Sequence, residues 1–160
     1  MTRELSTSDI TGIHQTLALF AHAVDNKETD ALSLVFTDDV TIEIGVGKGT
    51  VLHGLDAFRD YVRRLPADAA DHQTVDTIIL VDSDGTVRAR SRYLAVRADG
   101  SITNGDYLDI VTRTPRGWRI NYRRTVHRYP RVDGLIGPTA ITDEWRPEPA
   151  RAPLTIQQDR

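Results

Sequence analysis

The apolar residues in the first part of the chain follow a helical spacing. Between residues 10 and 24 an apolar side chain recurs every three or four positions, at Ile10, Ile13, Leu17, Phe20 and Val24. A run of serine, threonine and aspartate at residues 6–9 precedes them and supplies helix-capping side chains. The pattern therefore predicts a first helix over about residues 8–25.

Two shorter helical patterns and a strand pattern follow. Residues 29–36 place their apolar side chains on one helical face, at Ala31, Leu32, Val35 and Phe36. Residues 55–65 have the same spacing and should form a helix that ends before Pro66, because the residue before a proline avoids the helical conformation. Between these segments, residues 39–46 alternate apolar and polar side chains, which predicts a half-buried strand.

From residue 72 onward the pattern changes to strands. Four strand-like segments cover residues 72–82, 86–98, 102–114 and 117–129. The dipeptides between them favour hairpin turns, at Asp84-Gly85, Asp99-Gly100 and Arg116-Gly117. Three N-terminal helices followed by hairpins predict an α+β fold, in which a strongly curved, mostly antiparallel sheet wraps over the helices.

The last part of the chain is rich in proline, which separates a domain at residues 1–130 from a C-terminal tail at residues 131–160. The tail contains large apolar side chains, among them Leu135, Ile136, Ile141 and Trp145. Because these are too apolar to hang free in water, we expect the tail to pack on the domain, on a partner subunit, or over the open end of the fold as a lid.

Composition excludes several classes of function. The length of 160 residues favours one domain, and the net charge of −3 gives no electrostatic basis for binding nucleic acid. No apolar run reaches the roughly 18 residues of a membrane span, and the N-terminus lacks the apolar core of a signal peptide. We expect a cytoplasmic protein that binds neither nucleic acid nor membrane.

The residue types also limit the chemistry. The chain has no cysteine, which excludes disulfides, thiolate nucleophiles and cysteine-ligated metals. His22, His53 and His127 show no metal-ligand spacing with one another or with acidic residues. We therefore expect no metal and no other cofactor.

Asp25 is the residue of the first helix that the apolar pattern does not explain. At helical spacing it shares a face with Leu17 and Ala21, the side that should point into the fold. A carboxylate there must be hydrogen-bonded, paired or catalytic, and at the end of a helix it also opposes the helix dipole. The alternative is a turn between two helices, in which the aspartate side chain bonds to the nearby backbone.

Several segments resemble the SnoaL-like branch of the nuclear-transport-factor-2-like superfamily. They are AHAVD at 21–25, NKETDALSLVFTDDV at 26–40, HGLDAF at 53–58, DHQTV at 71–75 and GDYLDIVTRTPRGWRI at 105–120. With the order of elements, the resemblance extends over about residues 8–129. It implies a cone-shaped α+β barrel with one open end. Since this scaffold commonly dimerises through its sheet, a homodimer or homotrimer is expected.

The resemblance also implies a catalytic pair. Members that resemble scytalone dehydratase and the bile-acid dehydratase use an aspartate at the end of the first helix and a histidine that opens the first long strand. These positions are Asp25 and His72 here. Imidazole titrates near neutrality and can move a proton, while a carboxylate on its other ring nitrogen fixes the tautomer. Without the resemblance, His72 would be interpreted as a surface histidine beside Asp71.

These features lead us to expect a lyase, isomerase or cyclase that works by acid–base catalysis in an apolar cavity. Its substrate would be small, hydrophobic and oxygenated, like a polyketide, terpenoid or steroid. The alternative is a non-catalytic module for ligand binding or dimerisation, because the family contains both kinds of protein. A third interpretation is epoxide hydrolysis, which would require an Asp–Arg–Asp set for which Asp106 and Arg124 are candidates.

Strand alternation adds residues to the expected cavity wall. In residues 86–98, small side chains and Tyr93 should face inward, and an alternating set of arginines should form a solvated face. Asn104 and Asp106 share one face of the next strand and would suit recognition of a carbonyl or hydroxyl group; a bond to the neighbouring strand is the alternative. Arg124 shares a face with Trp118 on the last strand, and it should lie inside or form a salt bridge at the rim.

Phe20 marks a departure from the family pattern. The catalytic relatives carry a tyrosine five residues before the helix aspartate, whereas Phe20 has no hydroxyl group. Either Tyr61, Tyr93 or another donor replaces that phenol, or the reaction needs none. We place Phe20, Tyr61 and Tyr93 among the expected substrate-binding residues.

Overall fold

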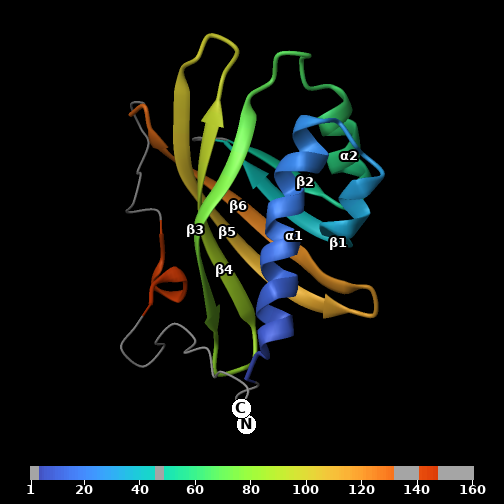
Figure 1. Cartoon of the computed structure of the whole chain (residues 1–160), viewed down its shortest axis with the longest axis vertical. Coiled ribbons are helices and arrows are strands. Elements are labelled where there is room, and N and C mark those ends of the chain that lie inside the picture. The colour runs from blue at the N-terminus through green and yellow to red at the C-terminus, as the bar shows by residue number, and fades with distance from the viewer. Residues whose placement is uncertain (1–3, 46–48, 132–140, 148–160) are drawn as a thin grey trace.

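The structure is a computed structural model of the whole chain, and it describes residues 4–45, 49–131 and 141–147. The elements are α1 (Thr7–Asp25), η1 (Ala31–Leu34), β1 (Phe36–Ile44), β2 (Thr50–His53), α2 (Leu55–Arg63), β3 (Asp71–Val81), β4 (Val87–Val96), β5 (Ile102–Thr114), β6 (Gly117–Tyr129) and η3 (Asp143–Trp145). Figure 1 shows α1 and α2 together on one side of a strongly curved sheet. No helix in the described part of the chain is long and apolar enough to cross a membrane.

The six strands form one mixed sheet in the order β2-β1-β6-β5-β4-β3. β1 and β6 run parallel, and all other neighbouring strands are antiparallel. In β3 the pairing register shifts between Val75 and Ile78, where Asp76 has a φ of 51°, and such a bulge bends a strand. The predicted α+β fold is confirmed. Its cone is not a closed barrel, because the edge strands β2 and β3 do not pair with each other.

Helix α1 forms where the apolar spacing predicts it. The side chains and backbone amides of Ser6 and Asp9 bond reciprocally in a capping box, which satisfies amide groups that the first turn leaves unpaired. Ile13 and Val24 on its inner face are buried in the main core. The helix ends at Asp25, beside the first residues of β3.

The predicted second helix at residues 29–36 is wrong in extent. Only one 3₁₀ turn forms, at Ala31–Leu34, and β1 begins at Phe36 rather than at residue 39. The cause is the sheet: the Ile120 amide donates to the Val35 carbonyl at 2.8 Å, and Phe36 pairs with Ile120. Strand pairing therefore ends the helical segment early, although Val35 and Phe36 are buried as their apolar character requires.

The tail packs on the convex side of the sheet in the part that the structure describes. Ile141 and Trp145 bury their side chains against Leu108 and Val126. Arg88 lies over the Trp145 ring at 4.8 Å. The expectation that apolar tail residues pack on the domain thus holds for these two, whereas residues 135 and 136 lie outside the described residues.

Candidate functional site

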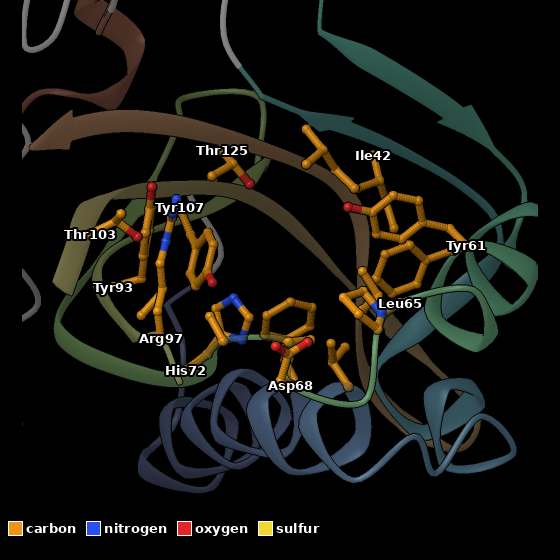
Figure 2. A pocket seen from close by; sticks show the side chains of 18 of the residues that line it. Ile42, Tyr61, Leu65, Asp68, His72, Tyr93, Arg97, Thr103, Tyr107 and Thr125 are labelled. Atoms are coloured by element: carbon orange, nitrogen blue, oxygen red, sulfur yellow. The ribbon is translucent and has the colours of Figure 1, made fainter. Parts of the chain in front are cut away.

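A cavity of about 610 Å³ lies between the helices and the concave face of the sheet. Its wall is mostly aromatic and aliphatic, with Phe20 from α1, Phe58 from α2 and Ile42 from β1 among the contributors. Polar side chains from the α2–β3 loop and from β3 to β6 interrupt this wall, as Figure 2 shows. The size and the mixture of apolar and polar groups are typical of small-molecule sites.

Asp25 and His72 meet at the edge of this cavity. Nδ1 of His72 lies 2.6 Å from Oδ1 of Asp25, and the backbone amide of His72 donates to Oδ2 at 2.7 Å. The carboxylate therefore contacts both the ring and the backbone of one residue, which fixes the side chain relative to the strand. The side chains are 12% and 23% exposed for Asp25 and His72. The two atoms lie within hydrogen-bond distance, as the family resemblance implies, and the catalytic role of the pair stays a prediction.

This hydrogen bond determines which nitrogen of His72 is available. An ionised carboxylate only accepts hydrogen bonds, so a neutral ring bonded to Asp25 carries its proton on Nδ1. Nε2 then has a free lone pair, and no described residue bonds to it. Because His72 lines the cavity while Asp25 lies behind it, the ring can exchange a proton with a bound molecule.

A second buried pair, Arg123 with Asp109, lies on the concave face of β5 and β6. Nε and Nη2 of Arg123 donate to the two carboxylate oxygens of Asp109, each at 2.7 Å. The guanidinium lies between the rings of Phe20 and Tyr107, at 4.1 and 4.2 Å from their centroids. Burial raises the pKa of Asp109, and the charge and hydrogen bonds of Arg123 oppose this rise.

One nitrogen of the Arg123 guanidinium, Nη1, takes no part in the pair with Asp109. The Arg123 side chain is 1% exposed and borders the cavity, and Nη1 is buried without a hydrogen-bond partner among the described residues. A buried N–H group without a partner is costly and uncommon, so this nitrogen is suited to bind an oxygen atom of a ligand.

Arg124 was expected either to lie inside, as a substrate-binding residue, or to form a salt bridge at the rim; the inward position is wrong, and the salt bridge is what the structure contains. The register between β5 and β6 shifts between Ile110 and Val111, which pair with Tyr122 and Ile120, so β6 contains one extra residue at that point. Beyond this extra residue, the side chains of β6 that strict alternation would place inward point outward, and those that it would place outward point inward. Arg123 therefore takes the inner position, while Arg124 is 43% exposed and lies 3.6 Å from Glu43.

Asp106 and Asn104 are also absent from the cavity wall, so their expected role in substrate binding is wrong, and Asp106 instead forms the alternative, a bond to the neighbouring strand. Asp106 is buried on the convex side, where its carboxylate is within 3.3 Å of three arginines, namely Arg90, Arg92 and Arg128. The arginines predicted to be solvated are thus partly buried in ion pairs. The outer face of β5 also carries apolar residues, because the tail covers Leu108 there. The alternation of apolar and polar residues along β5 therefore could not identify the inner face. That face carries Tyr107 and Asp109.

Phe20, Tyr61 and Tyr93 lie on the cavity wall, as expected. Burial, with a smaller effect of Asp106, raises the pKa of Tyr93 to about 12. The ring of Tyr93 lies against β5 at Gly105. A β-carbon on residue 105 would lie 2.8 Å from the Tyr93 hydroxyl and 2.1 Å from a backbone oxygen. Gly105 is therefore required for Tyr93 to lie where it does.

Tyr107 is a cavity residue that the sequence did not reveal. Its ring stacks on Tyr93 with centroids 4.8 Å apart, and Figure 2 shows its hydroxyl group directed toward the His72 ring. Burial raises the pKa of Tyr107 above its ordinary value of 10.0, and Arg123 only partly offsets the rise. The phenol therefore stays protonated and can donate a hydrogen bond.

No group of three or more histidine, aspartate or glutamate side chains arranged to hold a metal ion occurs within residues 4–45, 49–131 and 141–147. The donor groups at the cavity wall are imidazole, phenol, guanidinium and hydroxyl groups, among them those of His72, Tyr107, Arg123 and Thr125. This set can exchange protons and bind oxygen atoms.

Helices held in an open, curved sheet define the class of NTF2-like proteins with a cystatin-like fold. Within this class, the SnoaL-like domain family matches residues 6–124, and the chain belongs to that family. Among curated proteins, no sequence relative matches it.

Solved structures share the fold. ActVI-ORFA from Streptomyces coelicolor has a TM-score of 0.63 and 17% identity, covering 76% of this chain and 98% of that one. A candidate scytalone dehydratase from Novosphingobium aromaticivorans has a TM-score of 0.65 and 17% identity, covering 80% and 91%. An NTF2-like protein from the same organism has a TM-score of 0.66 and 22% identity, covering 79% and 86%. At such identities the likeness concerns the fold, and function must be argued from the site.

Proposed function

We propose that this protein is a cofactor-independent enzyme that removes a proton next to a carbonyl group of a small, hydrophobic, oxygenated ring compound. Dehydration of a β-hydroxy ketone, isomerisation of an unsaturated ketone and aldol-type cyclisation all begin with this step. The observation that carries the proposal is the hydrogen-bonded pair of Asp25 and His72 on the wall of an apolar cavity. A partly buried carboxylate that orients an imidazole toward an apolar space suits proton transfer.

In the first step, Nε2 of His72 takes the proton from the carbon next to the carbonyl group. The ring becomes an imidazolium ion, and the charge of Asp25 at 2.6 Å stabilises it. Proton transfer by a positioned side chain contributes about 10²–10⁴-fold to a rate.

The electrons of the broken C–H bond move to the carbonyl oxygen, which needs hydrogen-bond donors. The Tyr107 hydroxyl and Nη1 of Arg123 have no partner among the described residues, and both residues border the cavity. Donors that are already oriented in an apolar site stabilise such an oxyanion strongly. Tyr107 thus supplies from β5 the phenol that Phe20 lacks on α1.

His72 then returns its proton, which completes the reaction without a cofactor. In a dehydration the proton goes to a hydroxyl group on the β-carbon: the C–O bond breaks, a C=C bond forms and water leaves. In an isomerisation the proton goes to the γ-carbon and the double bond moves. In both cases the ring is neutral again and still bonded to Asp25.

Deuterium exchange tests the first step directly. In D₂O the wild-type protein should catalyse incorporation of deuterium next to the carbonyl group of a bicyclic ketone such as 2-tetralone, measured by NMR. His72→Ala should slow this exchange roughly 10²–10⁴-fold. Asp25→Asn should lower kcat more than it weakens binding, because the amide presents a donor where the ring also donates.

The double variant distinguishes a joint role from two separate roles. Because the two residues act as a unit, Asp25→Asn/His72→Ala should be little slower than His72→Ala alone. His53→Ala is a matched control, since His53 is exposed and lies outside the cavity wall. Exchange at the wild-type rate in a folded His72→Ala protein would refute the proposed reaction and favour a ligand-binding module.

A further inference from the structure

Arg97 brings to the cavity a positive charge that forms no ion pair with a described residue; after the hydrogen bonds of Ser101, this charge contributes to the lowered pKa of Asp99 in the same turn. The Arg97 side chain lines the cavity, and Figure 2 shows it on the same side as Tyr93 and Tyr107. Its backbone is held in the β4–β5 turn by hydrogen bonds with Ser101 and Gly100, both at 2.9 Å. No ion pair or hydrogen bond joins its guanidinium to any residue in the described ranges. The turn thus fixes the position of Arg97 and leaves its side chain available to a ligand.

The other charged groups at the cavity are already engaged, with one exception. Asp25 bonds to His72, and Arg123 bonds to Asp109. Asp99 accepts hydrogen bonds from the backbone and hydroxyl of Ser101 at 2.9 and 2.7 Å, so its carboxylate is held in the turn. The exception is Asp68, which has no bonded partner among the described residues. Figure 2 shows Asp68 and Arg97 on different sides of the cavity.

We propose that the substrate carries one carboxylate group, which Arg97 binds at the mouth while the rest of the molecule lies against the aromatic wall. This inference rests on the function proposed above, because it specifies the substrate class of the same cavity. A planar guanidinium matches the two oxygens of a carboxylate. The hydroxyl groups of Thr103 and Thr125 line the same cavity and offer further donors.

The charge distribution favours a carboxylate over a phosphate group. Asp68 and Asp99 both border the cavity, so a second negative charge on the ligand would be repelled by two carboxylates. A monoanion gains the attraction of Arg97 with less of this repulsion. Since Asp68 lies on another side than Arg97, the same charges favour one orientation of the bound molecule.

Binding of three probe molecules tests the inference without the natural substrate. 2-Naphthoate, 2-naphthamide and 2-naphthyl phosphate share a ring system and differ in charge, and calorimetry at low salt gives a Kd for each. We expect 2-naphthoate to bind roughly three- to fivefold more tightly than 2-naphthamide, the upper range for a solvent-accessible ion pair. The phosphate should gain no more than the carboxylate does.

Variants identify the residue responsible. Arg97→Gln should remove the preference for 2-naphthoate and leave the Kd of 2-naphthamide unchanged, whereas Arg97→Lys should keep part of the preference. Asp68→Asn should strengthen binding of 2-naphthoate, because it removes a repulsion. Arg116→Gln changes the net charge equally at an exposed turn outside the cavity wall, and it should alter no Kd.

Several outcomes would overturn the inference. These are equal affinity for naphthoate and naphthamide, a preference that survives in Arg97→Gln, binding of none of the probes, or a stronger, Arg97-dependent preference for the phosphate. The two proposals fail separately. His72→Ala should keep the preference for 2-naphthoate over 2-naphthamide. Wild-type proton exchange in that variant would refute the proposed reaction and would not affect the proposed carboxylate site at Arg97.

Discussion

Two pairs of side chains at this cavity, Asp25 with His72 and Arg123 with Asp109, are held so that each member depends on its partner. Asp25 bonds to both the ring and the backbone amide of His72, which leaves no freedom to rotate without losing a bond. Arg123 and Asp109 form a bidentate pair with exposures of 1% and 0%. Removing one member of a buried pair leaves a charge that neither water nor a partner stabilises.

Loss of Arg123 alone should therefore destabilise the protein more than loss of both Arg123 and Asp109. Arg123→Met should lower the free energy of unfolding by about 3–5 kcal/mol, because the Asp109 charge is left buried and unpaired. The double variant Arg123→Met/Asp109→Leu should recover much of this loss, since it contains no unpaired charge. Urea unfolding of the three proteins provides the measurement. An equal loss in both variants would instead assign the effect to packing of Arg123 on Phe20 and Tyr107.

Some of these residues could be predicted from the sequence, and others could not. A polar side chain on an apolar helix face is visible in the sequence, so Asp25 stands out, and the family pattern pairs it with His72. Arg123 and Arg124 are adjacent and chemically identical, and only the register shift in β6 decides which one faces the cavity. Tyr107 was missed because both faces of β5 carry apolar residues.

Among the elements, the start of α1 depends on Asp9, which ties the helix to the sheet. One carboxylate oxygen accepts hydrogen bonds from the Ser6 backbone and hydroxyl, at 3.1 and 2.8 Å. The other accepts from the Trp118 indole at 3.2 Å and pairs with Arg113. Burial opposes ionisation, but these hydrogen bonds and the charge of Arg113 together hold the pKa of Asp9 below 3.8.

The lowered pKa of Asp9 gives a prediction about acid stability. A group whose pKa is lower in the folded state stabilises the fold above its unfolded pKa, and that stability is lost as the pH falls through the folded pKa. Asp9→Asn should cost about 1 kcal/mol at pH 7, similar to the usual effect of weakening a helix cap, because it removes the charge that Ser6 and Arg113 stabilise. The difference from wild type should begin to shrink below about pH 4, where Asp9 of the unfolded chain takes up a proton, and it should disappear once the pH has fallen through the lower pKa of the folded state. Urea unfolding from pH 7 to pH 2.5 measures it, and a constant difference would contradict a role for the charge.

The spacing of apolar residues predicts helices and strands well where one face is buried and the backbone is regular. It places α1, α2 and the four long strands close to their observed bounds. It fails at residues 29–36, because a helical apolar spacing does not reveal that Ile120 will bond to Val35. It also fails at the β6 bulge, where Asn121 is the extra residue and its side-chain amide donates hydrogen bonds to Thr37 and Asp39.

For the molecule as a whole, the tail segment and the cavity lie on opposite faces of the sheet. Ile141 and Trp145 cover Leu108 and Val126 on the convex face, and neither lines the cavity. This separation suggests that the convex face contributes to stability, while the concave face determines what is bound.

A chain that ends at residue 131 tests this division. Burial of a large apolar side chain is worth about 1.5–3 kcal/mol, so loss of Ile141 and Trp145 should lower the free energy of unfolding by several kcal/mol. The Kd for 2-naphthoate should not change while the protein remains folded. Urea unfolding and calorimetry give the two values, and weaker binding at unchanged stability would support the tail as a lid.

The parallel pairing of β1 with β6 also affects how the protein is made. β1 ends at Ile44, whereas its long neighbour β6 spans Gly117–Tyr129, so nearly the whole domain must be synthesised before the two can pair. Contacts between such distant segments form slowly, and chains that lack them expose unpaired strand edges. A nascent chain from which β6 has not yet emerged would thus have no Arg123 between Phe20 and Tyr107, and ligand binding would begin only after β6 has paired.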